Sequence, residues 1–479
     1  MHSNTKPHTS GQRSIQRTIL TSILVILGLP LTLAFHHERH TDVPVNPTTI
    51  PEYDSVAGVV MYWDPYNNPA YDQIATAVIE HIQPRATVFM QTNNHAHEMD
   101  MINNLEDHDV TISDIVFIDV YGDRIWVRDH GPFSIYDNDT LAIVGFDDLA
   151  TGHGDQDLPE RLADFWELNY YDFSHIIFDG GNYLVDNHNR LFATQRLYTN
   201  NPNIPQSDID TILESYMGIE SIFIFNDLVD DYWGHLDMQI KLLNDTSFII
   251  SSVDEGHQDH YVLENNYAAL QAIDHPEGKT YQIEKIPKAD NWKTYINSFI
   301  VNDAVLVPVY DHPNDALALH TYQSLLPDKE IIGINANAMI QWEGAIHCIT
   351  NQLPPFYAQE EDDDENGDDD ENGDDDENGD NGDDTNTVEP GTAITNDAFH
   401  VHPNPASDVV MISFTINRRD NYSLRIFDSR GSTIRNIDIP AWHTGDYRIP
   451  LDTRDMDSGI YIVRLKSSEE SWHVRLIVP

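Results

Sequence analysis

Cysteine is nearly absent from the chain, which has 479 residues and a single thiol at Cys348. One cysteine excludes an intramolecular disulfide, so the folded parts must be stabilised by their hydrophobic cores. Hydrophobic residues make up 40% of the chain and aromatic residues 10%, which is enough for sizeable cores in two or three domains. A lone cysteine is either an inert buried residue or a reactive thiol, and its count alone leaves both open.

Basic residues are also scarce. Lys and Arg total 26 against 80 Asp and Glu, and the formal net charge is -54. Residues 360–384 contain seventeen acidic residues and no basic one, but the rest of the chain is acidic as well. A surface of this sign repels phosphates, so we expect no nucleic-acid partner. It would attract cationic substrates, although solubility is the simpler explanation of the charge.

Long apolar runs are absent after residue 35. Before it, Lys6, Arg13 and Arg17 precede an uncharged apolar stretch at 19–35 that is short for a spanning helix. Residues 1–35 are therefore predicted to be a signal peptide, with a retained membrane anchor as the alternative. We expect a mature protein without a membrane span that passes through the periplasm to the cell surface or the medium.

Residues 51–357 alternate short β-like runs with helical runs, which is typical of an α/β domain. Strands are predicted at 56–61, 88–90, 115–120, 142–146, 176–178, 222–225, 248–252 and 304–309. Helices are predicted at 71–83, 159–168, 205–217, 259–273 and 313–325. The last four helices start 46, 54 and 54 residues apart, which suggests a repeated strand–helix unit.

Residues 358–395 have a different character, because the hexapeptide DDDENG occurs three times between 362 and 379. That run has no apolar residue and cannot fold by burial. We predict a disordered, self-repelling acidic linker. Loose binding of cations is the alternative, although the spacing lacks the pattern of an EF-hand.

Residues 396–479 are rich in alternating and apolar runs, at 409–416, 422–427, 432–437 and 460–465, which predicts a small all-β sandwich. The segment contains HPNPA at 402–406, YSLRIFD at 422–428 and SGIYIVRL at 458–465. In this order they resemble the C-terminal sorting domain of type IX secretion cargo. The resemblance implies the type IX secretion machinery as a partner.

Four short motifs of the α/β domain combine acidic, imidazole and thiol side chains. They are WVRDHGP at 126–132, DGGN at 179–182, GHLD at 234–237 and GAIHC at 344–348. Asp129 is expected near a loop, because its motif ends in Gly-Pro. His235 and Asp237 would share one face if their segment is a strand. The glycines of DGGN would let the backbone approach a ligand. Each motif alone is more often structural, so the interpretation depends on the set.

The set fits the chemistry of a guanidinium group, which is planar, cationic and rich in N–H donors. Two carboxylates can hold its edges, a thiolate can attack its carbon, and an imidazole can protonate the departing amine. The α/β domain supplies each of these groups.

In their order, the motifs are similar to those of bacterial Porphyromonas-type peptidylarginine deiminases and the related agmatine deiminases, over roughly residues 51–355. The resemblance implies the pentein fold, a pseudo-fivefold α/β propeller. It also implies a hydrolase that converts a guanidinium group to a ureido group and ammonia through a covalent thiouronium intermediate. Neither a cofactor nor a metal is implied.

The resemblance also assigns roles to residues of this chain. Asp129 and Asp237 are expected to clamp the guanidinium, with His235 as general acid and then base. Cys348 is the expected nucleophile, and Asn297 matches a residue that orients the site. Further substrate contacts are expected from Trp126, Gly180, Gly181 and Asn182.

The substrate is left open between peptidyl-arginine, a small arginine derivative and agmatine, whose product is N-carbamoylputrescine. The resembling peptidyl enzymes carry an Arg pair that grips a terminal carboxylate, and residues 146–154 contain no Arg. This absence is compatible with agmatine, whereas export favours a peptide. Asp147, Asp148 and Asp155 are expected to repel a free carboxylate.

Other classes of function compete with the enzyme. A non-catalytic surface-binding protein would keep the fold without turnover. A papain-like protease would place its cysteine before its histidine, whereas here His235 precedes Cys348. A metalloenzyme would find its best cluster at 257–260, which lacks a recognised ligand spacing.

Overall fold

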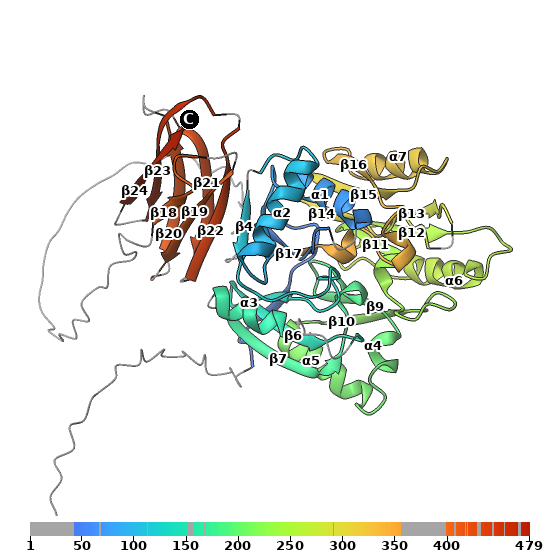
Figure 1. The fold of residues 1–479 in the computed structure, drawn as a ribbon. Coiled ribbons are helices and arrows are strands. Elements are labelled where there is room, and N and C mark those ends of the chain that lie inside the picture. The colour runs from blue at the N-terminus through green and yellow to red at the C-terminus, as the bar shows by residue number, and fades with distance from the viewer. Residues whose placement is uncertain are drawn as a thin grey trace, which may run out of the picture. The chain divides into compact units, whose positions relative to one another are not determined.

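The computed structural model of the chain is shown in Figure 1. It describes residues 43–66, 69–112, 114–150, 157–166, 168–290, 292–355, 399–406, 409–416, 418, 420–428, 433–442, 445–454, 456–467 and 471–479. The predicted signal peptide at 1–35 and the predicted linker at 358–395 lie outside the described residues. Within them, no helix combines the length and the apolar character that a bilayer crossing requires.

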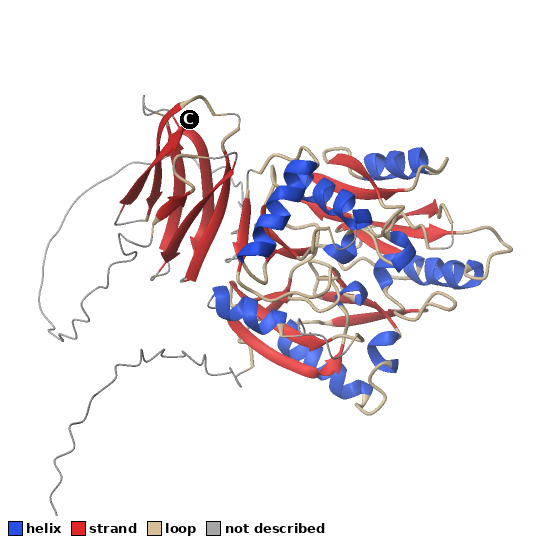
Figure 2. Cartoon of the chain, viewed as in Figure 1, coloured by secondary structure: helices blue, strands red, loops and turns tan. Residues whose placement is uncertain are grey.

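The α/β domain contains most of the helices (Figure 2). Its helices are α1 (Pro69–Ile82), α2 (His95–Asp107), α3 (Leu158–Trp166), α4 (Arg196–Thr199), α5 (Gln206–Met217), α6 (His260–Gln271) and α7 (Asp315–Leu325). Its strands are β1 (Pro47–Thr49), β2 (Gly58–Met61), β3 (Thr87–Gln91), β4 (Ile115–Ile118), β5 (Phe133–Asp137), β6 (Thr140–Asp147), β7 (Asn169–Ile177), β8 (Leu184–Val185), β9 (Arg190–Thr194), β10 (Ser221–Phe225), β11 (Ile240–Asn244), β12 (Ser247–Ser252), β13 (Gln282–Pro287), β14 (Phe299–Val301), β15 (Ala304–Val309), β16 (Glu330–Asn335) and β17 (Asn351–Leu353).

Within the described residues, five units share one pattern, in which two antiparallel strands are followed by a helix and a third strand parallel to the second. Four units are consecutive, β5–β6–α3–β7, β8–β9–α5–β10, β11–β12–α6–β13 and β14–β15–α7–β16. In the remaining unit, β17 from the end of the domain pairs with β2 near its beginning, and α1 and β3 follow. The predicted repetition of a strand–helix unit therefore extends through the domain.

The five helices predicted from apolar periodicity are all present, with ends that differ by at most two residues. On α1, Ile74, Val78 and Ile82 are fully buried, as its period of about 3.6 residues requires. Helix α2 was not predicted, because its inner face includes the buried polar residues Glu98 and Asn104 and so lacks a continuous apolar stripe.

The C-terminal domain is all-β, as predicted. Its strands are β18 (His400–His402), β19 (Val409–Ile416), β20 (Asp420–Phe427), β21 (Thr433–Trp442), β22 (Gly445–Asp452), β23 (Gly459–Lys466) and β24 (Ser471–Val478). Strands β18, β19 and β22 are antiparallel neighbours, and the other four form an antiparallel sheet in the order β21–β20–β23–β24. Alternate residues of β19 are buried, which gives one inner and one outer face.

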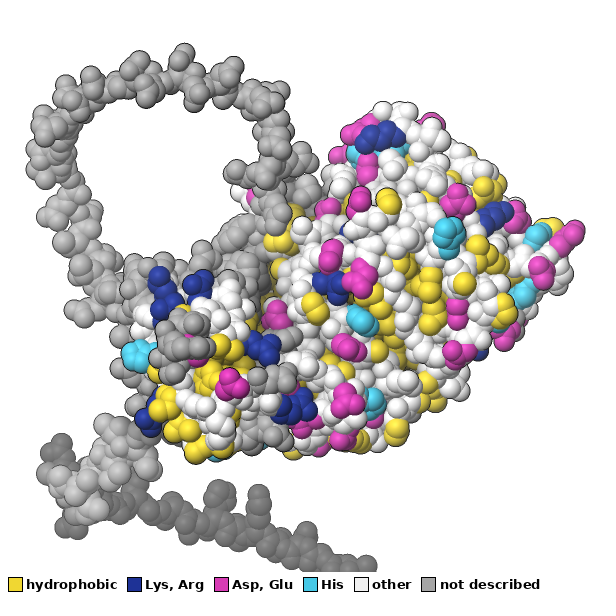
Figure 3. Space-filling model, turned by 90° about the horizontal axis from the view of Figure 1, so that it is seen from above, with side chains coloured by type: hydrophobic (Ala, Val, Ile, Leu, Met, Phe, Trp, Pro, Cys, Tyr) yellow, Lys and Arg dark blue, Asp and Glu magenta, His cyan; other side chains and the backbone are white. Residues whose placement is uncertain are grey.

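Acidic side chains are spread over the visible face of the α/β domain, with few basic ones between them (Figure 3). This distribution agrees with the charge of the sequence, in which acidic residues are about three times as frequent as basic ones. The negative charge is thus a general property of this face rather than one patch.

Candidate active site

The four motifs meet in one buried cluster of the α/β domain. Asp129 lies in a turn between β4 and β5, and Asp179 follows β7. His235 and Asp237 come just before β11, and Cys348 lies in a short 3-10 turn before β17. Because every one of these side chains sits in a connection beside a strand, the sheets hold the cluster from several sides.

The segment with His235 and Asp237 is not a strand, so the condition under which the two side chains would share one strand face is not met. Residues Leu236–Met238 form a 3-10 turn, and His235 before it is extended. The alternation of a strand therefore does not place the two side chains. Instead, the two side chains have different partners: His235 contacts Asp179 and Asp129, whereas Asp237 contacts Asn297 and His347.

His235 is held between two carboxylates. Its Nε2 lies 2.9 Å from Asp179 Oδ2, and its Nδ1 lies 3.8 Å from Asp129 Oδ1. Burial by itself lowers the pKa of His235, but the hydrogen bond to Asp179 and the charges of both carboxylates outweigh it and raise the pKa to about 10. The imidazole is therefore protonated at neutral pH and can donate a proton. Asp179 belongs to the DGGN motif, but sequence analysis assigned it no role.

The ionised form of Asp129 is destabilised in the empty site. Burial raises its pKa to about 8, and the charge of His235 only partly opposes this. Its Oδ1 is buried and has no hydrogen-bond partner among the described residues, and the same is true of Asp237 Oδ1. Two buried carboxylate oxygens without donors are unfavourable, so this cluster is suited to a ligand that brings N–H donors and positive charge.

Cys348 is positioned by Asn297. The amide Nδ2 of Asn297 donates to Asp237 Oδ2 at 3.0 Å and lies 3.3 Å from the sulfur. Its Oδ1 accepts the backbone N–H groups of Ala345 and His347, both at 3.1 Å, so the same side chain shapes the loop that carries the thiol. Burial raises the pKa of Cys348, and the charges of Asp237 and Asp129 raise it further. The thiol of the empty site is therefore neutral.

Behind Asp237 lies a buried network that sequence analysis missed. His347 Nδ1 is 2.6 Å from Asp237 Oδ2, and its Nε2 is 2.7 Å from Glu52 Oε2. Lys241 Nζ donates to both oxygens of Glu52, at 2.6 and 2.7 Å. Burial raises the pKa of Asp237, but the hydrogen bond and charge of His347 outweigh it and keep this carboxylate ionised. The only signal in the sequence is the position of His347 next to Cys348.

The glycines of the DGGN motif pack tightly against neighbouring residues of the protein, which leaves no room for a side chain. A Cβ on Gly181 would lie 2.4 Å from Nδ1 of His235, and a Cβ on Gly180 would lie 2.0 Å from the carbonyl oxygen of Arg128. Asn182 Oδ1 accepts the backbone N–H of Thr194 at 2.7 Å. These contacts explain why the turn needs glycine next to His235, and the expected ligand contacts of these residues stay a prediction.

Trp126 lies at the edge of the cluster and is partly buried. A Cβ on Gly344, in the motif that carries Cys348, would lie 2.4 Å from the indole ring. The ring thus packs directly on the loop that leads to the thiol. The expected contact of Trp126 with the substrate stays a prediction.

A family model for Porphyromonas-type peptidyl-arginine deiminase matches residues 48–354 of this chain. The chain belongs to this family. A protein of Lactococcus lactis named for agmatine deiminase is 26% identical to the deiminase over an alignment of 284 residues, and the match covers 50% of this chain and 78% of the relative. The family is one of hydrolases that act on C–N bonds of guanidino groups, and this chain is an enzyme of that class.

Solved structures agree with the fold of the deiminase. Agmatine deiminase of Enterococcus faecalis has a TM-score of 0.59 at 19% identity, covering 66% of this chain and 99% of its own. A Porphyromonas gingivalis protein described as an arginine deiminase has a TM-score of 0.57 at 21% identity, covering 66% of this chain and 100% of its own. At these identities the likeness concerns the fold.

The C-terminal domain matches a second model, the secretion system C-terminal sorting domain, at residues 400–479. This match agrees with the resemblance to type IX cargo in the sequence. The sorting domain indicates that the deiminase is exported and is secreted or displayed at the cell surface.

Proposed function

We propose that the deiminase hydrolyses the guanidinium of an arginine residue or a small arginine derivative, with Cys348 as nucleophile. The observation that carries this proposal is the pair of buried carboxylate oxygens on Asp129 and Asp237 that lack donors beside the thiol. A guanidinium presents N–H groups in a plane and a positive charge, so it satisfies both oxygens at once.

Binding of the cation also prepares the thiol. Burial raises the pKa of Cys348 in the empty site, the charge of Asp237 raises it further, and Asp129 adds to this effect when it is ionised; a bound guanidinium opposes both charges. The thiol then loses its proton to solvent, and the thiolate attacks the guanidinium carbon and forms a C–S bond. The resulting tetrahedral adduct is held by the two carboxylates, while Asn297 keeps the sulfur in place.

His235 moves the protons of both half-reactions. As an imidazolium it donates its proton to the departing amine, the C–N bond breaks, and ammonia leaves a thiouronium on the sulfur. The neutral imidazole then takes a proton from water, and the hydroxyl oxygen attacks the same carbon. Collapse of this adduct breaks the C–S bond and the O–H proton passes to solvent, which releases the ureido product and restores the thiolate.

Three basic residues that could hold a terminal carboxylate, Arg124, Arg190 and Arg196, are already paired within the protein. Arg124 pairs with Asp148 at 2.6 Å, Arg190 with Asp186 at 2.8 Å, and Arg196 with Asp227 at 2.8 Å. The expectation that Asp148 repels an anion is therefore weakened, because a guanidinium of the protein already neutralises it. Residues 151–156 of this stretch lie outside the described residues.

Agmatine is the second candidate substrate, because relatives carry the name of its deiminase and it has no carboxylate to bind. The deciding experiment offers the purified protein agmatine, free arginine, a peptide ending in arginine, its amide, and a peptide with internal arginine. Ureido product and ammonia are measured for each. Absence of ammonia from all of them would support the non-catalytic surface-binding alternative instead.

The repeated units and the segment boundaries of the chain also bear on its function. We infer that the five repeated units surround the site as the pseudo-fivefold propeller of the pentein fold, and the pairing of β17 with β2 supports closure of the ring. The proposed boundaries are 1–35 for the signal peptide, 51–357 for the deiminase domain, 358–395 for the acidic linker and 396–479 for the sorting domain. Mass spectrometry of both termini of the exported protein tests whether the signal peptide and the sorting domain are removed.

A further inference from the structure

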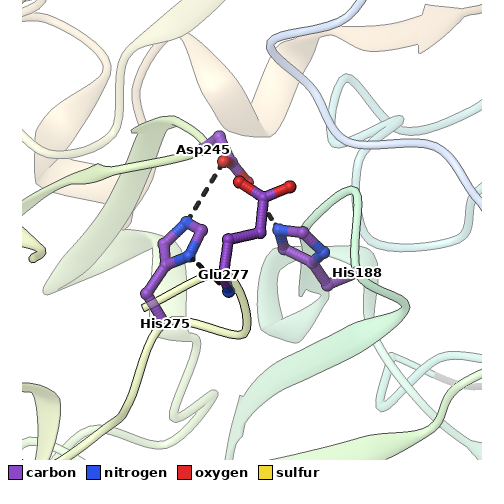
Figure 4. A group of neighbouring side chains, drawn as sticks. All are labelled: His188, Asp245, His275 and Glu277. Atoms are coloured by element: carbon purple, nitrogen blue, oxygen red, sulfur yellow. Dashed lines mark hydrogen bonds and ion pairs between the residues drawn. The ribbon is translucent and has the colours of Figure 1, made fainter. Parts of the chain in front are cut away.

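A second cluster of chemically active side chains lies away from the active site. Figure 4 shows His188, Asp245, His275 and Glu277, which come from three loops. His188 lies between β8 and β9, Asp245 between β11 and β12, and the other two between α6 and β13. Strand β11 separates Asp245 from the active-site end of its unit by five residues, or roughly 17 Å at the rise of a strand.

The ligand atoms of the four side chains all lie within 4.8 Å of one another. His188 Nε2 and Asp245 Oδ1 form an ion pair at 3.2 Å, but these two buried atoms make no hydrogen bond with each other or with another described residue. Two ligands of a tetrahedral zinc ion at about 2.0 Å are about 3.3 Å apart. The pair is thus spaced as two ligands of one ion, and an ion would satisfy both atoms.

His275 has a different part in the cluster. Its side chain is fully buried, its Nδ1 accepts the backbone N–H of Glu277 at 3.1 Å, and its Nε2 lies 3.1 Å from Asp245 Oδ2. The neutral ring must therefore carry its proton on Nε2 and donate it to Asp245. A carboxylate ligand oriented by a hydrogen bond of this kind is common around protein metal ions.

A cation of the protein already lies over the two carboxylates. Lys279 Nζ is 2.5 Å from Glu277 Oε2 and 3.4 Å from Asp245 Oδ2, and its side chain is half exposed. The side chains of Asp245 and Glu277 are themselves 28% and 52% exposed, so solvent reaches both carboxylates. A metal ion can therefore reach the carboxylates by displacing the flexible ammonium group.

We propose that His188, Asp245 and Glu277 bind one divalent ion of the zinc class, with His275 as the residue that orients Asp245. An imidazole ligand favours zinc over calcium or magnesium, which prefer oxygen alone. The ion ties the loop of the β8–β10 unit to the loops of the β11–β13 unit. Its role is structural, because the ligands lie at the other end of β11 from His235 and Asp237.

The test uses the full-length protein with Cys348→Ser, so that the thiol adds no zinc affinity. After removal of metals with EDTA, zinc sulfate is titrated by calorimetry, and bound zinc is measured after gel filtration. We expect one equivalent of tight binding that calcium does not displace. His188→Ala and Asp245→Asn should each weaken it at least tenfold, whereas Lys279→Gln should strengthen it because the competing cation is gone.

The matched control is the double variant His257→Ala/His260→Ala. It removes two histidines near Asp259 that do not belong to a group of side chains with metal-binding geometry among the described residues. It should bind zinc like the parent. The acidic run at 360–384 is unchanged in every variant, so its contribution cancels in the comparison. Binding that is absent in the parent, equal in Asp245→Asn, or lowered in Lys279→Gln would overturn the proposal. If a ligand variant fails to fold, the affinity of the Lys279→Gln protein still tests the proposal.

Discussion

Substrate binding should release a proton from Asp129, and the effect is measurable with an inactive enzyme. In the empty site, burial raises the pKa of this carboxyl to about 8. A bound guanidinium stabilises the ionised form and lowers that pKa. A group that loses its proton on binding makes the affinity rise with pH, up to the pKa of the free state.

The size of the effect follows from the pKa. With a value of about 8, roughly 1% of Asp129 is ionised at pH 6 and about half at pH 8. The affinity for a guanidinium ligand should therefore rise about 50-fold across this range. His235, with a pKa of about 10, stays protonated throughout and adds little.

The assay is calorimetry of agmatine, or of an amidated arginine peptide, with the Cys348→Ser protein. Titrations in two buffers of different ionisation enthalpy count the protons, and close to one proton should leave per ligand at pH 6. Asp129→Asn is the control, because it has no proton to lose and its weaker binding should be nearly independent of pH. Proton uptake on binding, or the same pH dependence in Asp129→Asn, would refute the reasoning.

Four further predictions concern catalysis and stability. Cys348→Ser should abolish ammonia release while the circular dichroism spectrum stays unchanged, and activity within about tenfold of the parent would exclude this nucleophile. Asp237→Asn should cost at least about 3 kcal/mol of transition-state stabilisation, measured as kcat/KM, since it breaks a charged contact to the substrate. His347→Ala should lower the free energy of unfolding by about 3 kcal/mol in denaturant titrations, because Glu52 and Asp237 each lose a buried partner. Amidation of a peptide that ends in arginine should not reduce kcat/KM, and a strong preference for the free acid would mean that a basic group reaches the site.

The sequence alone predicted many of the regular elements and the main chemical groups proposed for the site. Apolar residues three and four apart on α1 must share a face, so its helix and buried side were predictable from local spacing. The types and order of Asp129, His235, Asp237 and Cys348 pointed to guanidinium chemistry, because few other reactions need this combination. Helix α2 escaped prediction because polar residues fill part of its buried face.

Only the tertiary structure decided which distant residues meet. Glu52 and His347 are 295 positions apart, and no local pattern relates them until β17 pairs with β2. The same holds for His188, Asp245 and His275, which share no ligand spacing in the sequence because three loops of two units bring them together. Local spacing reports the conformation of a segment, whereas contacts between segments depend on the packing of the whole domain. For this reason the sequence predicted which groups we propose to react, whereas the fold decided which residues contact them and shift their pKa values.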